Sequence, residues 1–62
     1  MYSKVLDEGK EIEFITQQYE TGLYVAVYED GRIADQFGTT MSDKEFHKHI
    51  KKVYKDKVVT QN

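Results

Sequence analysis

The sequence predicts an α+β fold: a three-stranded antiparallel sheet over residues 10–38, with one C-terminal amphipathic helix packed on one face. The sheet has four strands if residues 1–9 add one at its edge. Three observations predict this β-β-β-α order. A strongly β-prone run fills residues 23–29, an Asp30-Gly31 pair follows it, and a full set of helix-start signals surrounds Ser42. A chain of 62 residues is short enough that we expect one small domain with a thin core.

The run over residues 23–29 is the clearest strand. Successive side chains of a strand point to opposite faces of the sheet, so this segment should be apolar on both. One face would carry Leu23, Val25 and Val27, and the other would carry Tyr24, Ala26 and Tyr28. The sheet is therefore expected to have a second apolar surface on the side away from the helix.

The Asp30-Gly31 pair favours a two-residue type I′ hairpin turn. If the turn is of this simple kind, the return strand places Ile33 and Phe37 on the same face as the valines. Asp35 would then share that face, at its edge.

The first long strand is expected between residues 11 and 20. Its alternation is interrupted by two adjacent apolar residues, Phe14 and Ile15, which indicates a bulge or a change of face. Gly22 fits the turn that follows, because glycine tolerates a positive φ. For residues 1–9 we expect a short edge strand, with a loose arm as the alternative.

The helix is expected over residues 42–58. Ser42 is a suitable N-cap, Glu45 completes a capping box, and Met41 can pack against Phe46 as a hydrophobic staple. The stripe expected to face the sheet consists of Phe46, Ile50, Val53, Tyr54 and Val58. Residues 59–62 should fray as a tail.

Charge is divided unevenly along the chain, although the net charge is only −2. Up to Gly38 there are three basic and eight acidic residues, a net −5. From Thr39 onward six lysines oppose three acidic residues, a net +3. The sheet half is thus acidic and the helix half basic, while the net charge of the whole chain is not typical of a general nucleic-acid binder.

No motif in the chain predicts an enzyme, a cofactor or a metal site. There is no cysteine, and the glycines are isolated turn residues that form no phosphate-binding loop. His47 and His49 stand two residues apart on a helix, so their side chains diverge. We expect both to be ordinary, partly exposed histidines and the protein to have no enzymatic activity.

Four lysines follow one side of the expected helix: Lys44, Lys48, Lys51 and Lys55. Such a stripe can contact phosphate groups, and it can equally be a solvated outer face. The three-stranded plan backed by one helix resembles, at the level of the fold, the arm-binding domains of some phage integrases. Nucleic-acid binding through the lysine stripe is therefore the alternative function.

The leading hypothesis is a small, homodimeric regulatory module that binds a protein partner. Its contact surface would be the tyrosine-bearing sheet face or an exposed strand edge, because tyrosine is enriched in interfaces. The residues assigned to this surface are Tyr19, Tyr24, Tyr28 and Ala34. A chain with no apolar run long enough for a signal peptide or a membrane span, and with no cysteine, is expected in the cytoplasm.

Overall fold

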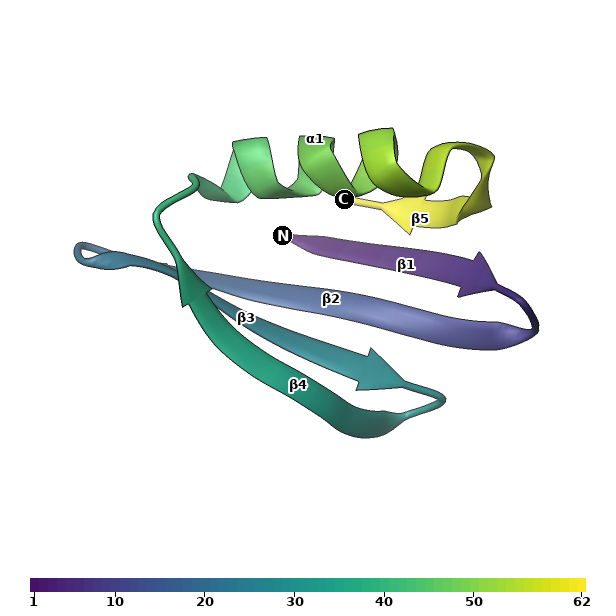
Figure 1. Cartoon of the computed structure of the whole chain (residues 1–62). Coiled ribbons are helices and arrows are strands. Elements are labelled where there is room, and N and C mark those ends of the chain that lie inside the picture. Colours follow the sequence, from purple (N-terminus) through teal and green to yellow (C-terminus); the bar gives the residue numbers. More distant parts are fainter.

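The computed structural model, which describes residues 1–62, is an α+β fold with five antiparallel strands and one helix near the C-terminus. The strands are β1 (Tyr2–Asp7), β2 (Lys10–Tyr19), β3 (Gly22–Glu29), β4 (Arg32–Thr39) and β5 (Val58–Gln61). The order across the sheet is β4-β3-β2-β1-β5. Helix α1 (Asp43–Tyr54) and a 3₁₀ turn (Lys55–Lys57) connect β4 to β5 and lie across one face (Figure 1).

The first four strands form a meander whose turns follow from the sequence. Asp30 and Gly31 both have positive φ, at 51° and 81°, as a type I′ hairpin requires. Glu8 and Gly9 repeat this geometry between β1 and β2, so the edge strand expected over residues 1–9 is present. The prediction of three or four strands was correct for the meander and one or two strands short for the sheet.

The missing strand is β5, in the segment expected to fray. Helix α1 ends at Tyr54, earlier than predicted, and Lys55 takes a positive φ of 53° that turns the chain back toward the sheet. Residues 58–61 then pair antiparallel with β1, with Ser3 opposite Gln61 and a register shift between Lys4 and Val5. Val58, expected to continue the helical stripe, instead packs against the core from β5.

The core lies between the helix and the inner face of β1, β2 and β3. It consists of Val5, Phe14, Leu23, Val25, Phe46 and Ile50. The rings of Phe14 and Phe46 meet edge to face, with centroids 6.0 Å apart. Val53, predicted in the same stripe, is instead 54% exposed, because the core-facing positions recur at four-residue steps, Phe46, Ile50 and Tyr54, and Val53 lies to the side of them.

Strand β2 keeps a regular register with both neighbours, so the bulge expected at Phe14 and Ile15 is absent. The two residues face opposite sides of the sheet, and each side is apolar at that point. The bulge lies instead in β4, where the pairing with β3 shifts beside Val27 and Tyr28. This shift pairs Ile33 with Tyr28 on the outer face, which corrects the expectation that Ile33 faces the valines.

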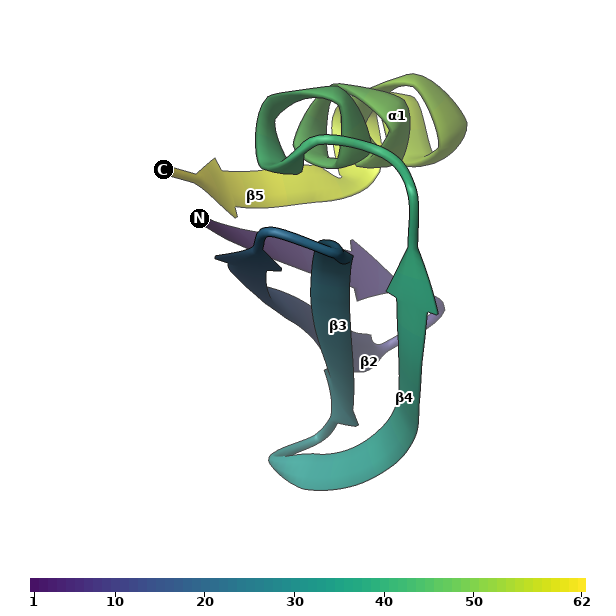
Figure 2. The same ribbon diagram turned by 90° about the vertical axis from the view of Figure 1, so that its left-hand side faces the viewer.

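The sheet curls strongly, and the helix covers only part of it. Figure 2 shows the β3–β4 hairpin extending away beneath the helix, which lies over the β1–β5 side. Strand β4 is accordingly exposed along almost its whole length. Glycine is required at position 22, where a Cβ atom would lie 2.9 Å from the carbonyl oxygen of Thr39 and φ is +147°. The helical part of the chain lacks the length and the apolar composition that a membrane-spanning helix needs.

Candidate functional site

The outer face of the sheet, on the side away from the helix, is the first candidate site. Its side chains come from alternate positions of each strand, and the strand register aligns them in rows. Each row crosses the sheet from β2 through β3 to β4. The first row, beside the β2–β3 turn, is Tyr19 with Gly22, and the second is Gln17 with Tyr24 and Gly38. The third row is Ile15 with Ala26 and Gln36, and the fourth, nearest the β3–β4 turn, is Glu13 with Tyr28 and Ile33. We call the first three rows, together with Tyr28 and Ile33, the neutral face, since none of these residues carries a charge.

Ala26 lies at the floor of a hollow in the neutral face. Although it points away from the core, it is only 9% exposed, because larger side chains surround it. The hollow is lined by Ile15, Gln17, Tyr24, Tyr28, Ile33 and Gln36. Ile33 stands at its rim and is 51% exposed. A concave apolar floor with polar groups at its border is the usual composition of a binding surface.

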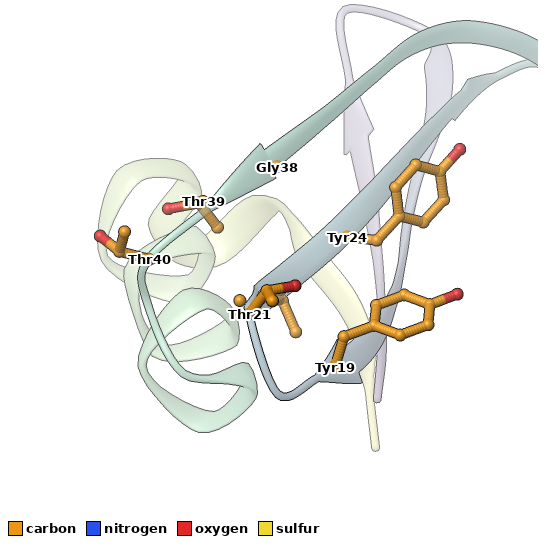
Figure 3. A pocket seen from close by; sticks show the side chains of 8 residues that line it. Tyr19, Thr21, Tyr24, Gly38, Thr39 and Thr40 are labelled. Carbon is orange, nitrogen blue, oxygen red and sulfur yellow. The ribbon is translucent and has the colours of Figure 1, made fainter.

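Tyr24 lines both this hollow and a second one, which lies at the β2–β3 turn. The second hollow includes Tyr19, Thr21, Gly38 and Thr39, and Figure 3 shows the rings of Tyr19 and Tyr24 projecting on the same side. The Tyr24 hydroxyl donates a hydrogen bond to the Gln36 side chain, which holds the ring in place across the two strands. Tyr24 is therefore a fixed aromatic residue at the centre of the exposed face.

Charged groups of the outer face gather at its β1 border. Lys4 and Glu11 form an ion pair of 3.0 Å, and the Tyr2 hydroxyl donates to the Glu13 carboxylate at 2.6 Å. The hydrogen bond to that carboxylate raises the pKa of Tyr2 above its ordinary value of 10.0. Both signs of charge are thus present at the border, and none lies beside Ala26.

The structure brings Tyr24 and Tyr28 onto one face, as the two-residue period predicted, and the pairing of β2 with β3 places Tyr19 on the same face. Ala34 does not join them: it is the extra residue of the β4 bulge and lies beside Ile33 near the hairpin turn. Sequence reasoning missed Ile15 and Ile33 as members of this face. Ile15 could have been found by continuing the alternation through Phe14, whereas the bulge that turns Ile33 outward has no signal in the sequence.

The lysine stripe is the second candidate. Lys44, Lys48 and Lys51 are exposed on α1, and Lys55 is exposed in the 3₁₀ turn. None of them, nor Lys52, has a carboxylate within 4.0 Å, whereas Lys4, Lys10 and Lys57 are all paired. The helix therefore presents unneutralised positive charge on the side opposite the sheet.

A buried polar network between helix and sheet is the third feature, and the sequence did not predict it. His47 was expected to be partly exposed, but it is 1% exposed and lies between Ser3 of β1 and Thr16 of β2. Its Nδ1 meets the Ser3 hydroxyl, and its Nε2 lies 2.8 Å from the Thr16 hydroxyl and 3.2 Å from Asp43 Oδ1. The available signal was the spacing of Asp43 and His47, which are i and i+4 on one helix.

The partners of each group fix the direction of the hydrogen bonds. A carboxylate only accepts, so His47 Nε2 carries the ring hydrogen and Nδ1 accepts from the Ser3 hydroxyl. Gln61 Nε2 in turn donates to Ser3 Oγ at 3.0 Å and to the His47 carbonyl at 2.8 Å. The Thr16 hydroxyl donates to Asp43, and no buried side-chain polar atom is left without a partner.

This arrangement sets the charge states of the network. Burial lowers the pKa of His47 below its ordinary value of 6.5, and the neighbouring Asp43 offsets only part of that effect. Burial acts on Asp43 in the opposite sense, but the hydrogen bonds from Thr16 and from the Met1 amino group at 3.1 Å outweigh it and leave the pKa lowered. His47 is consequently neutral at pH 7 and Asp43 is ionised.

Ser3, His47 and Asp43 are the residue types of a hydrolase triad, but their placement gives a structural role. Ser3 is completely buried, so no substrate carbonyl can reach its hydroxyl. The hydrogen bond from Ser3 also satisfies Nδ1, which fixes the ring orientation and joins the helix to β1. The structure contains no group of three or more side chains arranged to hold a metal ion.

Comparison with protein-family models, with curated proteins and with solved structures finds no match to this chain.

Proposed function

We propose that the protein is a small, non-enzymatic regulatory module that binds a protein partner through the neutral face of its sheet. The observation that carries this proposal is the hollow over Ala26, bordered by exposed aliphatic and tyrosine side chains and free of charge. Depletion of charge with enrichment of tyrosine distinguishes the centre of an interface from the ordinary surface. We place this activity in the cytoplasm, supported by the cysteine-free composition.

The geometry favours the sheet face over the strand edge as the contact surface. The free edge of β4 carries the bulge at Ile33 and Ala34, and Asp35 points from it toward the inner face. Bulges and inward-pointing charges are the devices by which edge strands resist pairing with another chain. The neutral face has no comparable obstacle, since Tyr24 and Gln36 hold one another in place beside an open hollow.

A photo-crosslinking amino acid at defined surface positions tests this proposal. Placed at Tyr24, it should give discrete protein adducts in cells, because its ring stands on the neutral face. Placed at Val53, which is 54% exposed on the helix, it should give few or none. Adducts from Tyr24 that also disappear when Ile33 is replaced by Lys would support a specific interface. Equal adducts from both positions, or none from Tyr24, would contradict it.

A second function, nucleic-acid binding, is supported by the unpaired lysines of the helix. Lys44, Lys48 and Lys51 would contact phosphate groups of a nucleic-acid backbone. Binding of this kind weakens steeply as the salt concentration rises. Fluorescence anisotropy with a short labelled duplex at about 50 and 200 mM salt measures it, and a complex of three phosphate contacts should weaken by more than tenfold. A Lys48→Glu/Lys51→Glu variant should lose this binding, and unchanged affinity in that variant would exclude the stripe.

A further inference from the structure

The side chains of the neutral face restrict which kind of partner can bind there. We infer that a second copy of this chain packs there, face to face, with Ile33 of each copy over the Ala26 hollow of the other. This inference rests on the proposed function and names the occupant of the same surface.

The shape of the face suits a two-fold arrangement. In a two-fold interface the same patch serves both partners, so it must contain both a projection and a recess to receive it. Ile33 is an exposed aliphatic side chain at the rim, and the Ala26 floor lies beside it. Ile33 pairs with Tyr28, two residues along β3 from Ala26, so the projection and the recess are diagonal neighbours on adjacent strands, about 7–8 Å apart. Each copy therefore offers one projection and one recess.

The charge distribution favours a copy of the same chain. A surface that meets itself places like groups near like groups, which costs free energy wherever those groups are charged. Between β2 and β4 the three rows from Tyr19 to Gln36 are uncharged, so self-pairing brings no two charges of one sign together there. At the border Lys4 is already paired with Glu11, and Glu13 accepts from Tyr2. The contact lies within the acidic half of the chain, but none of the acidic side chains of that half belongs to the neutral face.

The size of the face sets the expected strength. Eight residues of β3 at about 3.4 Å each span roughly 27 Å, and the three strands β2, β3 and β4 at about 4.8 Å each span roughly 14 Å. The projected face is about 400 Å² per copy, so the total buried area is about 800 Å², the size of a weak, transient contact. The whole accessible surface of the chain is only 4479 Å², so even this contact covers nearly a tenth of it. We expect a micromolar dimer.

The need for extra burial supports the same occupant. The core contains only six buried apolar side chains. A chain of this size buries only about 60% of the surface that its unfolded form exposes, so further burial adds usefully to a small margin. A second sheet packed on the neutral face would shield Ile15, Ile33 and Tyr24 at once.

Sedimentation velocity from about 1 µM to 1 mM, at low and at high salt, tests the inference. The wild-type chain should shift from monomer to dimer with concentration, equally at both salt concentrations, because the contact is apolar. Ile33→Lys and Ala26→Arg should remain monomeric throughout, with unchanged circular dichroism. Val53→Lys is the matched control, since it places the same charge at an equally exposed aliphatic position on the helix. It should dimerise like the wild type.

Three outcomes would overturn the inference. A wild-type monomer at 1 mM excludes a second copy, and a dimer that both Ile33→Lys and Ala26→Arg leave intact excludes the neutral face as its contact surface. A dimer lost at high salt would point to charged groups in place of the neutral face. The inference and the proposed function fail separately: a strict monomer whose Tyr24 still crosslinks to a different protein retains the function with another occupant. A Tyr24 position that crosslinks to nothing removes both.

Discussion

Replacing Ser3 by Ala tests the buried network that joins the helix to the sheet. The Ser3 hydroxyl is the donor to His47 Nδ1 and the acceptor for Gln61 Nε2. In Ser3→Ala the Gln61 amide keeps its bond to the His47 carbonyl, but Nδ1 remains buried without a partner. An unsatisfied buried polar group costs about 1–3 kcal/mol. A chain of this length, at about 0.05–0.15 kcal/mol per residue, has only roughly 3–9 kcal/mol in total.

Urea denaturation at pH 7.5, followed by circular dichroism, measures this loss. With an m-value of about 1 kcal/mol/M, typical of the smallest domains, the midpoint should fall by about 1–3 M while the slope stays the same. Thr21→Ala, in the exposed turn before β3, is the control and should change stability by less than about 0.5 kcal/mol. If Ser3→Ala behaves like Thr21→Ala, then Nδ1 does not depend on Ser3 and our assignment of the His47 ring hydrogen is wrong.

Three further predictions concern the same elements. Stability should fall as the pH drops below 6.5, because the pKa of His47 is lowered on folding and the unfolded chain then binds the proton more readily; a second fall should follow below 3.8, from Asp43. Urea midpoints between about pH 8 and pH 2.5 cover both falls, and His49→Gln, on the exposed side of the helix, is the matched control variant. Gln61→Ala should cost about 1–2 kcal/mol in the same assay, against little for Thr60→Ala, and a frayed tail would show no difference between the two. Gly22→Ala should destabilise by more than Gly9→Ala, since only the Cβ atom at position 22 meets backbone, and a smaller effect at position 22 would contradict the close approach of Thr39.

The meander and the start of the helix could be predicted because their signals are local. A two-residue turn needs two residues with positive φ, and Asp30-Gly31 provides them without reference to the rest of the chain. Ser42 caps the helix by accepting from the Glu45 amide at 3.2 Å, and its own hydroxyl donates to the Glu45 carboxylate. These interactions form within four residues, so the sequence alone specifies them.

Strand β5 could not be predicted because its evidence is distant. Residues 58–61 gain their backbone partners from β1, more than fifty residues earlier in the chain. The helix is also capped at its C-terminus by Lys55, a non-glycine residue with positive φ, which no sequence rule favours there. Contact with the sheet holds this conformation: the Lys57 ammonium pairs with Asp7 at 2.7 Å, and Val58 packs on the core. Tertiary contacts decide the end of this helix.

The candidate site divides in the same way. The tyrosines of β3 follow from the period of the strand, whereas the outward position of Ile33 depends on a bulge that only the pairing with β3 creates. In the sequence, His47 and His49 stand out as a pair of potential metal ligands. The informative pair was Asp43 with His47, whose spacing places both on one helix face, and their true partners come from β1 and β2.

Strand β3 connects the fold to the proposed function while keeping their side chains separate. Leu23 and Val25 point into the core, and Tyr24 and Ala26 point to the neutral face from the same strand. A change on the outer face therefore leaves the packing with Phe46 intact, as long as the strand itself persists. Binding and stability should then be separable by mutation: Ile33→Lys affects association with little loss of stability, and Ser3→Ala affects stability with no direct contact to the neutral face. A chain in which both variants damaged both properties would have no such division between its two faces.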